Sequence, residues 1–240
     1  MINPKDLFEF LYKNHINFFS GVPDSLLKYF CAYLSDHCSE DQHIISANEG
    51  NAIGLAAGYY LGSKKPSMVY LQNSGIGNII NPILSLADKE VYRIPMLLLI
   101  GWRGEPSIKD EPQHVKQGKV TTQILDSIGV EWFIVGPETK NPIDVFAKAL
   151  RLMYSSESPV AVIVKKNTFE KYHLLKKEEK ESLLLREEAL KIILDNLSKN
   201  SLIVSTTGMT SREIFECRES KGQPHFKDFL TVGSMGHTSS

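Results

Sequence analysis

Residues 94–106 read Ile-Pro-Met-Leu-Leu-Leu-Ile-Gly-Trp-Arg-Gly-Glu-Pro. The continuous apolar part of this segment, from Ile94 to Ile100, predicts a strand that is buried on both faces, as is typical of a parallel sheet. The polar residues that follow it predict a loop at the carboxyl end of that strand. Ligands of open parallel sheets bind beyond the carboxyl ends of the strands, so this loop is a candidate site.

Strands and helices alternate on both sides of this segment. Strands are expected at residues 43–47, 67–71, 131–135 and 159–164, with a short apolar run at 16–19, and helices at 49–61, 77–87, 116–128 and 142–154. Asn3-Pro4 is expected to begin one further helix and Asp24-Ser25 to cap another, which runs to about Leu34. This alternation predicts βαβ units, and therefore an α/β fold in which helices flank both faces of a parallel sheet.

The chain changes character after about residue 168. Residues 176–181 read KKEEKE, a mixed-charge stretch that is typical of a solvated linker. Beyond it, helices are expected at 186–197 and 210–218, and strands at 202–205 and 229–232. About 55 residues are few for an independent α/β domain. We predict a first domain at 1–168, a linker at 169–185 and the N-terminal part of a second α/β domain at 186–240.

Composition and charge exclude several classes of protein. The chain has 240 residues, with 27 Lys and Arg against 28 Asp and Glu, so it lacks the positive charge that general nucleic-acid binding requires. The longest strongly apolar run, residues 96–100, is far shorter than the roughly 20 residues of a membrane span, and residues 1–6 do not resemble a signal peptide. Cys31 and Cys38 lie about two helical turns apart, too far for a disulfide. With Cys217 they are expected to be small buried thiols of a cytoplasmic protein.

The first candidate chemical group is Glu49, in the first turn of the helix predicted at 49–61. The helix macrodipole favours a carboxylate there, which is by itself an ordinary structural role. Gly54, Ala56, Ala57 and Gly58 make one side of this helix small, so another backbone can pack closely against it.

Two loops carry the other candidates. Residues 72–78, QNSGIGN, run from a strand end into two glycines that open a helix, a turn that can present N–H groups to an anion or serve only as a cap. The segment lacks the spacing of the known phosphate-binding motifs. In the loop after Ile100, Arg103 and Lys109 are suited to hold a dianion, and His114 to move protons near neutral pH. The alternative is a surface loop with internal ion pairs.

Several segments together resemble the thiamine-diphosphate-dependent 2-keto-acid decarboxylases, and within that family the phosphonopyruvate decarboxylases and the related sulfopyruvate enzymes. The segments are GVPDS (21–25), NEGNA (48–52), QNSGIGN (72–78), GWRGEP (101–106), KDEPQH (109–114) and TGMTSRE (207–213). The fourth and fifth are the most specific, and the resemblance continues to Ser240.

The resemblance implies a pyrimidine-binding domain followed by a diphosphate-binding domain. The active site would form between two subunits, so a homo-oligomer, at least a dimer, is expected. Glu49 matches the glutamate that hydrogen-bonds the cofactor's aminopyrimidine ring. Residues 233–236, GSMG, match the motif that holds the cofactor bent, with the carbonyl of the first residue accepting from the exocyclic amine and the methionine lying between the two rings. The residues matched to cofactor contacts are Glu49, Thr207, Gly208, Thr210, Gly233 and Met235.

The activity that the resemblance implies is decarboxylation of 3-phosphonopyruvate to phosphonoacetaldehyde and CO2, a step of phosphonate biosynthesis. Asp24 and His114 are candidates for proton handling. Arg103, Lys109 and Asn73 are candidates for binding the phosphonate and the carboxylate of this small keto-acid substrate. The alternatives are decarboxylation of sulfopyruvate or another 2-keto acid, and a non-catalytic interaction module.

One departure from the family concerns Mg²⁺. The family holds this ion, which bridges to the diphosphate, with a Gly-Asp-Gly motif and a following Asn, and no Gly-Asp-Gly occurs in this sequence. The main oxygen ligands that Mg²⁺ requires are therefore absent from the chain. We expect the chain to be part of a longer protein, because the sequence stops inside a motif. The alternative is a separate second subunit, as in the two-subunit sulfopyruvate enzymes.

Overall fold

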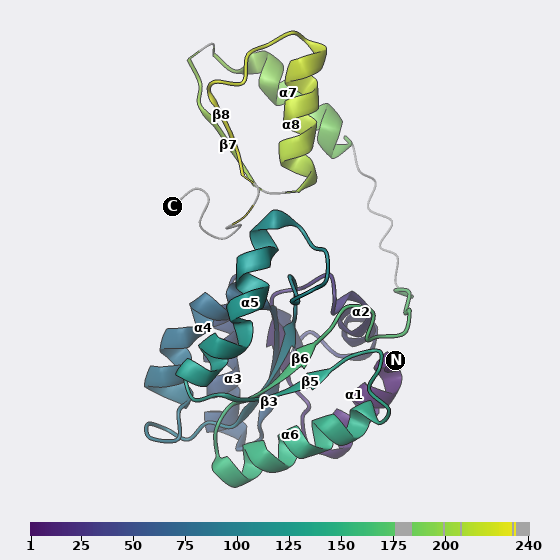
Figure 1. Cartoon of the computed structure of the whole chain (residues 1–240), viewed down its shortest axis with the longest axis vertical. Helices are drawn as coiled ribbons and strands as arrows, with labels where there is room; N and C mark the ends of the chain where they lie inside the picture. Colours follow the sequence, from purple (N-terminus) through teal and green to yellow (C-terminus); the bar gives the residue numbers. More distant parts are fainter. Residues whose placement is uncertain (176–183, 199, 207, 232, 234–240) are drawn as a thin grey trace. The chain divides into compact units, whose positions relative to one another are not determined.

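The computed structural model describes residues 1–175, 184–198, 200–206, 208–231 and 233. The chain divides into two compact units, Met1–Lys177 and Glu178–Ser240, each of which is described by itself (Figure 1). The limits 168 and 186 that were expected for two cofactor-binding domains stay predictions, as does the cofactor-binding role of each unit.

The first unit is built on a six-stranded sheet in the order β2-β1-β3-β4-β6-β5, and every neighbouring pair is parallel. The strands are β1 (Phe19–Gly21), β2 (His43–Ile45), β3 (Ser67–Gln72), β4 (Met96–Gly101), β5 (Glu131–Val135) and β6 (Val160–Val164). All residues of β4 are buried, as its continuous apolar sequence predicts. The predicted parallel α/β sheet is therefore confirmed.

Helices cover both faces of this sheet (Figure 1). They are α1 (Pro4–Lys13), α2 (Lys28–His37), α3 (Glu49–Ser63), α4 (Ile76–Pro82), α5 (Pro112–Ser127) and α6 (Pro142–Ser156); a short 3-10 turn (Asn73–Gly75) precedes α4 and a π-helical turn (Ile83–Ala87) continues it. The side chains of β4 alternate between two apolar clusters. Leu97 and Leu99 pack with α1, α2 and α6, whereas Leu98 and Ile100 pack with α3, α4 and α5.

Two helix starts differ from the prediction, and both differences concern the site. The second helix begins at Lys28 rather than after Asp24-Ser25, because the Asp24 carboxylate instead accepts from the N–H of Leu26, at 2.7 Å, and closes a turn. Helix α5 begins four residues earlier than expected, since Pro112 occupies its first turn. His114 consequently lies in the first turn of α5 rather than in the loop.

The second unit contains α7 (Arg186–Asn196), β7 (Ile203–Ser205), α8 (Met209–Ser220) and β8 (Asp228–Leu230). Its two strands are parallel neighbours, and Leu194, Ile214 and Cys217 form its small apolar core. All four elements were expected from the sequence, although position 232, in the last predicted strand, lies outside the described residues.

Within the described ranges, no helix has the length and apolar character needed to cross a bilayer. Cys31, Cys38 and Cys217 are all free thiols; the first and third are buried and Cys38 is half-buried at the end of α2.

Candidate functional site

Four of the predicted site residues follow neighbouring strands of the first sheet. Asp24 comes after β1, Glu49 after β2, Asn73 after β3 and Arg103 after β4. Because these strands are parallel and adjacent, their carboxyl ends meet at one edge of the sheet. The fold therefore brings these four residues to the same edge.

Glu49 is the first residue of α3, and its half-buried carboxylate lies against the start of α4. Its Oε2 accepts a hydrogen bond from the Asn78 amide at 2.7 Å. A Cβ atom on Gly75 would overlap the same carboxylate, so only glycine leaves room for Glu49 in this position. The position of the carboxylate is thus fixed by the turn that precedes α4 and by α4 itself.

Asp24 is a buried carboxyl group with one unpaired oxygen. The residue is 4% exposed, and Oδ1 has no hydrogen-bond partner among the described residues. A Cβ atom on Gly101 would overlap Oδ2, so the end of β4 makes room for the group. Burial raises the pKa of Asp24, although the Leu26 N–H and the Arg103 charge oppose that shift. A buried carboxyl whose pKa is raised is suited to hold and release a proton.

Asn73 connects β3 to the loop after β4. Its Nδ2 donates to the carbonyl of Arg103 at 2.8 Å and to the hydroxyl of Thr121 at 2.9 Å, and its Oδ1 accepts from the N–H of Arg103 at 3.1 Å. The residue is 1% exposed. The side-chain amide of Asn73 thus bonds the Arg103 backbone and Thr121, and substrate binding by Asn73 stays a prediction.

Arg103 is paired within its own loop. Its Nε and Nη2 donate to the two carboxylate oxygens of Asp110 at 2.9 and 2.5 Å, and its Nη1 donates to Ser25 at 3.1 Å. The hydrogen bonds from Arg103 hold the pKa of Asp110 well below its usual range. The loop therefore contains an internal ion pair, and substrate binding by Arg103 stays a prediction. The sequence analysis missed Asp110, although a carboxylate in the same polar loop was a usable signal.

The loop is also fixed to α5. Gly104 adopts a φ of 68°, and the Gly104 and Gly118 backbones pack so closely that a Cβ atom on either would overlap its neighbours. The indole N–H of Trp102 donates to the carbonyl of Gly118 at 2.9 Å. Both the entry to the loop and its far end at Asp110 are therefore anchored.

His114 and Lys109 differ in their surroundings. His114 is half-buried, and burial, with a contribution from the Arg103 charge, lowers its pKa. Lys109 is exposed and has no carboxylate partner in the described part of the chain. The histidine is therefore favoured in its neutral form near neutral pH, while the lysine stays available as a cation.

The predicted cofactor residues of the second unit are described only in part. Gly208 precedes α8 with a φ of 89°, a conformation that favours glycine, and Thr210 lies half-buried in the first turn of that helix. Gly233 is half-buried, whereas Thr207 and Met235 lie outside the described residues. Cofactor contact by these residues stays a prediction.

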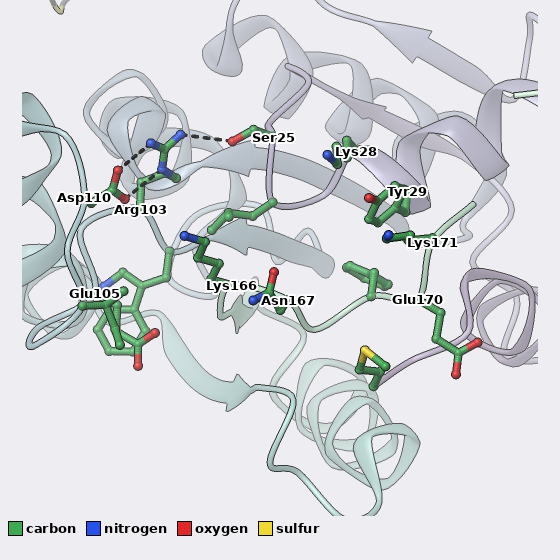
Figure 2. Close-up of a pocket in the computed structure, with 15 residues that line it drawn as sticks. Ser25, Lys28, Tyr29, Arg103, Glu105, Asp110, Lys166, Asn167, Glu170 and Lys171 are labelled. Atoms are coloured by element: carbon green, nitrogen blue, oxygen red, sulfur yellow. Dashed lines mark hydrogen bonds and ion pairs between the residues drawn. The ribbon is translucent and has the colours of Figure 1, made fainter. Parts of the chain in front are cut away.

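A pocket of about 640 Å³ lies farther along the edge of the first sheet (Figure 2). Its walls include Ser25 after β1, Arg103 after β4, and Lys166 and Asn167 after β6. The sequence analysis did not single out the last two residues. Their position directly after the last strand of the first unit was the available signal.

The comparisons with known proteins agree on one family. Residues 4–128 match the family model described as "Thiamine pyrophosphate enzyme, N-terminal TPP binding domain". This chain belongs to the thiamine pyrophosphate enzyme family. The matched residues contain Asp24, Glu49, Asn73, Arg103 and His114, so the sheet edge described above lies within the family's cofactor-binding domain.

Individual relatives extend the match over the chain. Phosphonopyruvate decarboxylase from Streptomyces viridochromogenes is 30% identical over 98% of this chain and 61% of its own length. Sulfopyruvate decarboxylase subunit alpha from Methanococcus maripaludis is 35% identical over 62% of this chain and 86% of its own length. The chain thus spans about three fifths of the curated phosphonopyruvate decarboxylases that it matches.

A solved structure shares the fold. Benzoylformate decarboxylase from Polynucleobacter necessarius matches with a TM-score of 0.50 and 18% identity, over 88% of this chain and 40% of that one. At this identity the likeness shows the fold alone.

The residues of the sheet edge fit thiamine diphosphate. The carboxylate of Glu49 can accept a hydrogen bond from a pyrimidine ring, and two buried polar atoms nearby in the fold, Asp24 Oδ1 and Ser46 Oγ, lack partners among the described residues. The residues do not provide a magnesium site. The described ranges contain no group of three or more His, Cys, Asp or Glu side chains that could hold a metal, and we assign no step to a metal here.

Proposed function

We propose that this chain forms the cofactor-binding part of a thiamine diphosphate-dependent decarboxylase that converts 3-phosphonopyruvate to phosphonoacetaldehyde and CO2, a step of phosphonate biosynthesis. The supporting observation is the extent of similarity. Phosphonopyruvate decarboxylase from Streptomyces viridochromogenes is 30% identical over 98% of the chain, which includes both compact units, whereas a sulfopyruvate decarboxylase that covers 100% of the chain is 25% identical.

When bound, thiamine diphosphate supplies an electron sink for the electron pair that remains when CO2 leaves. Glu49 would hold the cofactor's pyrimidine ring through its carboxylate, which Asn78 and the glycine at position 75 keep in place. A fixed carboxylate avoids the loss of side-chain freedom during each turnover, which is the advantage of a preorganised site.

Asp24 is our candidate for delivering a proton to the carbon from which CO2 departs. Its raised pKa increases the protonated fraction, and its unpaired Oδ1 is the atom that would carry the proton. His114, with its lowered pKa, would serve as a neutral hydrogen-bonding group nearby. Lys109 is the free cation of the loop and our candidate for the phosphonate, while Arg103, held by Asn73 and Asp110, shapes the wall of the site.

We further propose that the active form is a homo-oligomer, at least a dimer. Gly54 and Gly58 of α3 are exposed, and a Cβ atom on either would meet nothing within 4 Å in the described structure. The neighbouring Leu55 and Leu61 are exposed apolar side chains on the same helix. A second copy packed on this small, apolar face would bury it and would bring a subunit boundary close to the start of α3, where Glu49 lies.

Sulfopyruvate is the second candidate substrate, because the chain is 35% identical to a sulfopyruvate decarboxylase subunit over 86% of that subunit's length. Sulfopyruvate and phosphonopyruvate differ in the charge and shape of one terminal group. The choice between them is therefore a question of loop chemistry and not of the fold.

The test is a substrate panel. The chain, alone and together with any sequence that follows Ser240 in its reading frame, is incubated with thiamine diphosphate, Mg²⁺ and either phosphonopyruvate, sulfopyruvate or pyruvate, and CO2 release is measured. We expect phosphonopyruvate to react fastest and Glu49→Gln to abolish most of the rate. Faster turnover of sulfopyruvate would replace the first candidate with the second, and no turnover and no cofactor binding in either form would refute both.

A further inference from the structure

The pocket beside Arg103 has a charge surplus that the proposed reaction does not use. Four of its lining side chains are cationic, namely Lys28, Arg103, Lys166 and Lys171, and three are carboxylates, namely Glu105, Asp110 and Glu170. Figure 2 shows Lys28 and Lys171 at one end of the pocket in this view, the Arg103–Asp110 pair at the other, and Lys166 between them. These residues come from three separate segments of the first unit, after β1, after β4 and after β6.

Each carboxylate of the pocket already has a partner. Asp110 is bound by Arg103, and Glu105 is 3.0 Å from Nζ of Lys165, which lies outside the lining. Glu170 accepts a hydrogen bond from the amide of Asn3 at 3.0 Å. Two of the three carboxylates are therefore ion-paired with cations other than the pocket lysines, whereas the neutral amide bound to Glu170 does not offset the charge of that carboxylate.

The three lysines have no such partners. Lys28, Lys166 and Lys171 are exposed and form no ion pair with any residue that the structure describes. Like charges gathered around one cavity repel one another and raise the local concentration of anions. The surplus therefore favours a ligand with more than one negative charge.

The first turn of α2 contributes two residues of the lining, Lys28 and Tyr29. The ammonium of Lys28 lies 4.8 Å from the centroid of the Tyr29 ring. The Tyr29 hydroxyl offers a hydrogen-bond donor to an oxyanion.

The rest of the lining is apolar. Leu26, Trp102 and Phe169 contribute to the walls, and the volume of about 640 Å³ lies in the range of sites for small organic molecules. Inorganic phosphate alone would fill only a part of such a pocket. The observations favour an anion that carries an organic group.

We propose that this pocket binds a small organic phosphate or phosphonate at a site separate from Glu49 and Asp24. Lys28 and Lys171 bind its charged group, Lys166 adds to the positive charge of the pocket, and the apolar wall contacts the remainder. The source of the ligand is either the phosphonate-bearing keto acid itself, bound at a second position, or an unrelated phosphorylated metabolite that acts on the enzyme as an effector.

The test measures binding to the full chain by isothermal titration calorimetry, without thiamine diphosphate, so that it does not depend on the proposed activity. The probes are inorganic phosphate, phosphonoacetate and glycerol 3-phosphate at low ionic strength. Lys166→Gln with Lys171→Gln removes two pocket charges, and Lys65→Gln with Lys89→Gln is the matched control, since both of those lysines are exposed and lie outside the lining. We expect the pocket variant to bind at least one organic probe on the order of tenfold more weakly than the wild type and the control.

The outcomes separate the sources as well. Tighter binding of phosphonoacetate identifies a carboxylate-bearing phosphonate, as in the keto acid, and tighter binding of glycerol 3-phosphate identifies a phosphorylated metabolite. Glu49→Gln should leave the affinity of either probe unchanged. The proposal is refuted if no organic probe binds at millimolar concentration, or if the pocket variant and the surface control bind equally well.

Discussion

Replacement of Gly75 by alanine should move the carboxylate of Glu49 without changing its chemistry. Gly75 has a φ of −85° and a ψ of −3°, which alanine adopts readily, so the backbone itself is not strained. The new Cβ atom, however, would overlap the Glu49 carboxylate, which is the end of a flexible side chain and is able to move away.

The cost follows from the bond that is lost. The hydrogen bond from Asn78 to Glu49 involves a charged acceptor, and loss of such a bond lowers the free energy of unfolding by about 1.5–3 kcal/mol. Replacement of glycine by alanine also raises the free energy of unfolding by about 0.4–1 kcal/mol, because alanine restricts the unfolded chain. The net loss of about 0.5–2.6 kcal/mol corresponds to a decrease in Tm of about 1–10 °C for a unit of this size.

Gly77→Ala is the matched control. Gly77 lies in α4, two residues further on, where a Cβ atom would meet nothing within 4 Å. This variant should gain only the higher helix propensity of alanine, and should melt at the same or a higher temperature than the wild type. The assay is thermal unfolding followed by circular dichroism. Equal Tm values for the two variants would refute the contact between Gly75 and Glu49.

In an active preparation, Gly75→Ala should also reduce kcat by about 10²-fold, because the carboxylate of Glu49 is misplaced. An unchanged kcat would remove Glu49 from the cofactor site.

Three further variants test other features of the first unit. Burial raises the pKa of Asp24, so the stability that its protonated form gives is complete below the unfolded-state pKa of 3.8 and is lost as the pH rises through the folded-state pKa. Asp24→Asn should therefore raise Tm at pH 7 but not below about pH 4. A lower Tm at pH 7 would contradict this. Arg103 lowers the pKa of Asp110, so the stability that the ion pair gives is present above pH 3.8 and is lost in acid. Asp110→Asn should lower the free energy of unfolding by about 1–3 kcal/mol at pH 7 and by less in acid. Urea titrations at the two pH values measure this difference. Gly58→Leu should shift the chain toward monomer in light scattering if α3 forms a subunit interface, and an unchanged mass would place that interface elsewhere.

The sheet could be predicted because its signal is local. The apolar run that forms β4 can be satisfied only by burial on both faces, and glycine and proline mark the ends of the neighbouring elements. Right-handed crossovers leave the order of the strands open, but parallel strands place their carboxyl ends at one edge of the sheet in any order. For the same reason, the residues that follow β1 to β4 could be identified as candidates from the sequence.

The partners of the side chains could not be predicted in this way. Asp24 and Ser25 resemble a helix cap, yet the Asp24 carboxylate closes a turn and the helix begins three residues later. Arg103 resembles a free anion-binding cation, yet Asp110 binds it from within the same loop. In each case the sequence offers two acceptable partners, and the choice depends on tertiary packing around the strand ends. The lysines of the pocket were missed because Lys28 is distant in the sequence from Lys166 and Lys171, and only the fold brings these segments to one pocket.

The crossing of Gly104 and Gly118 has a consequence for how this fold diversifies. The entry to the loop is fixed at that crossing, Glu105 is bound to Lys165, and the far end is fixed by the Arg103–Asp110 pair, so residues 106–109 form an exposed tip between anchored positions. Replacements within the tip alter what the protein presents to an incoming molecule without removing any of these anchoring contacts. Exchange of residues 106–109 for those of other members of the family is thus a direct test of what this loop contacts.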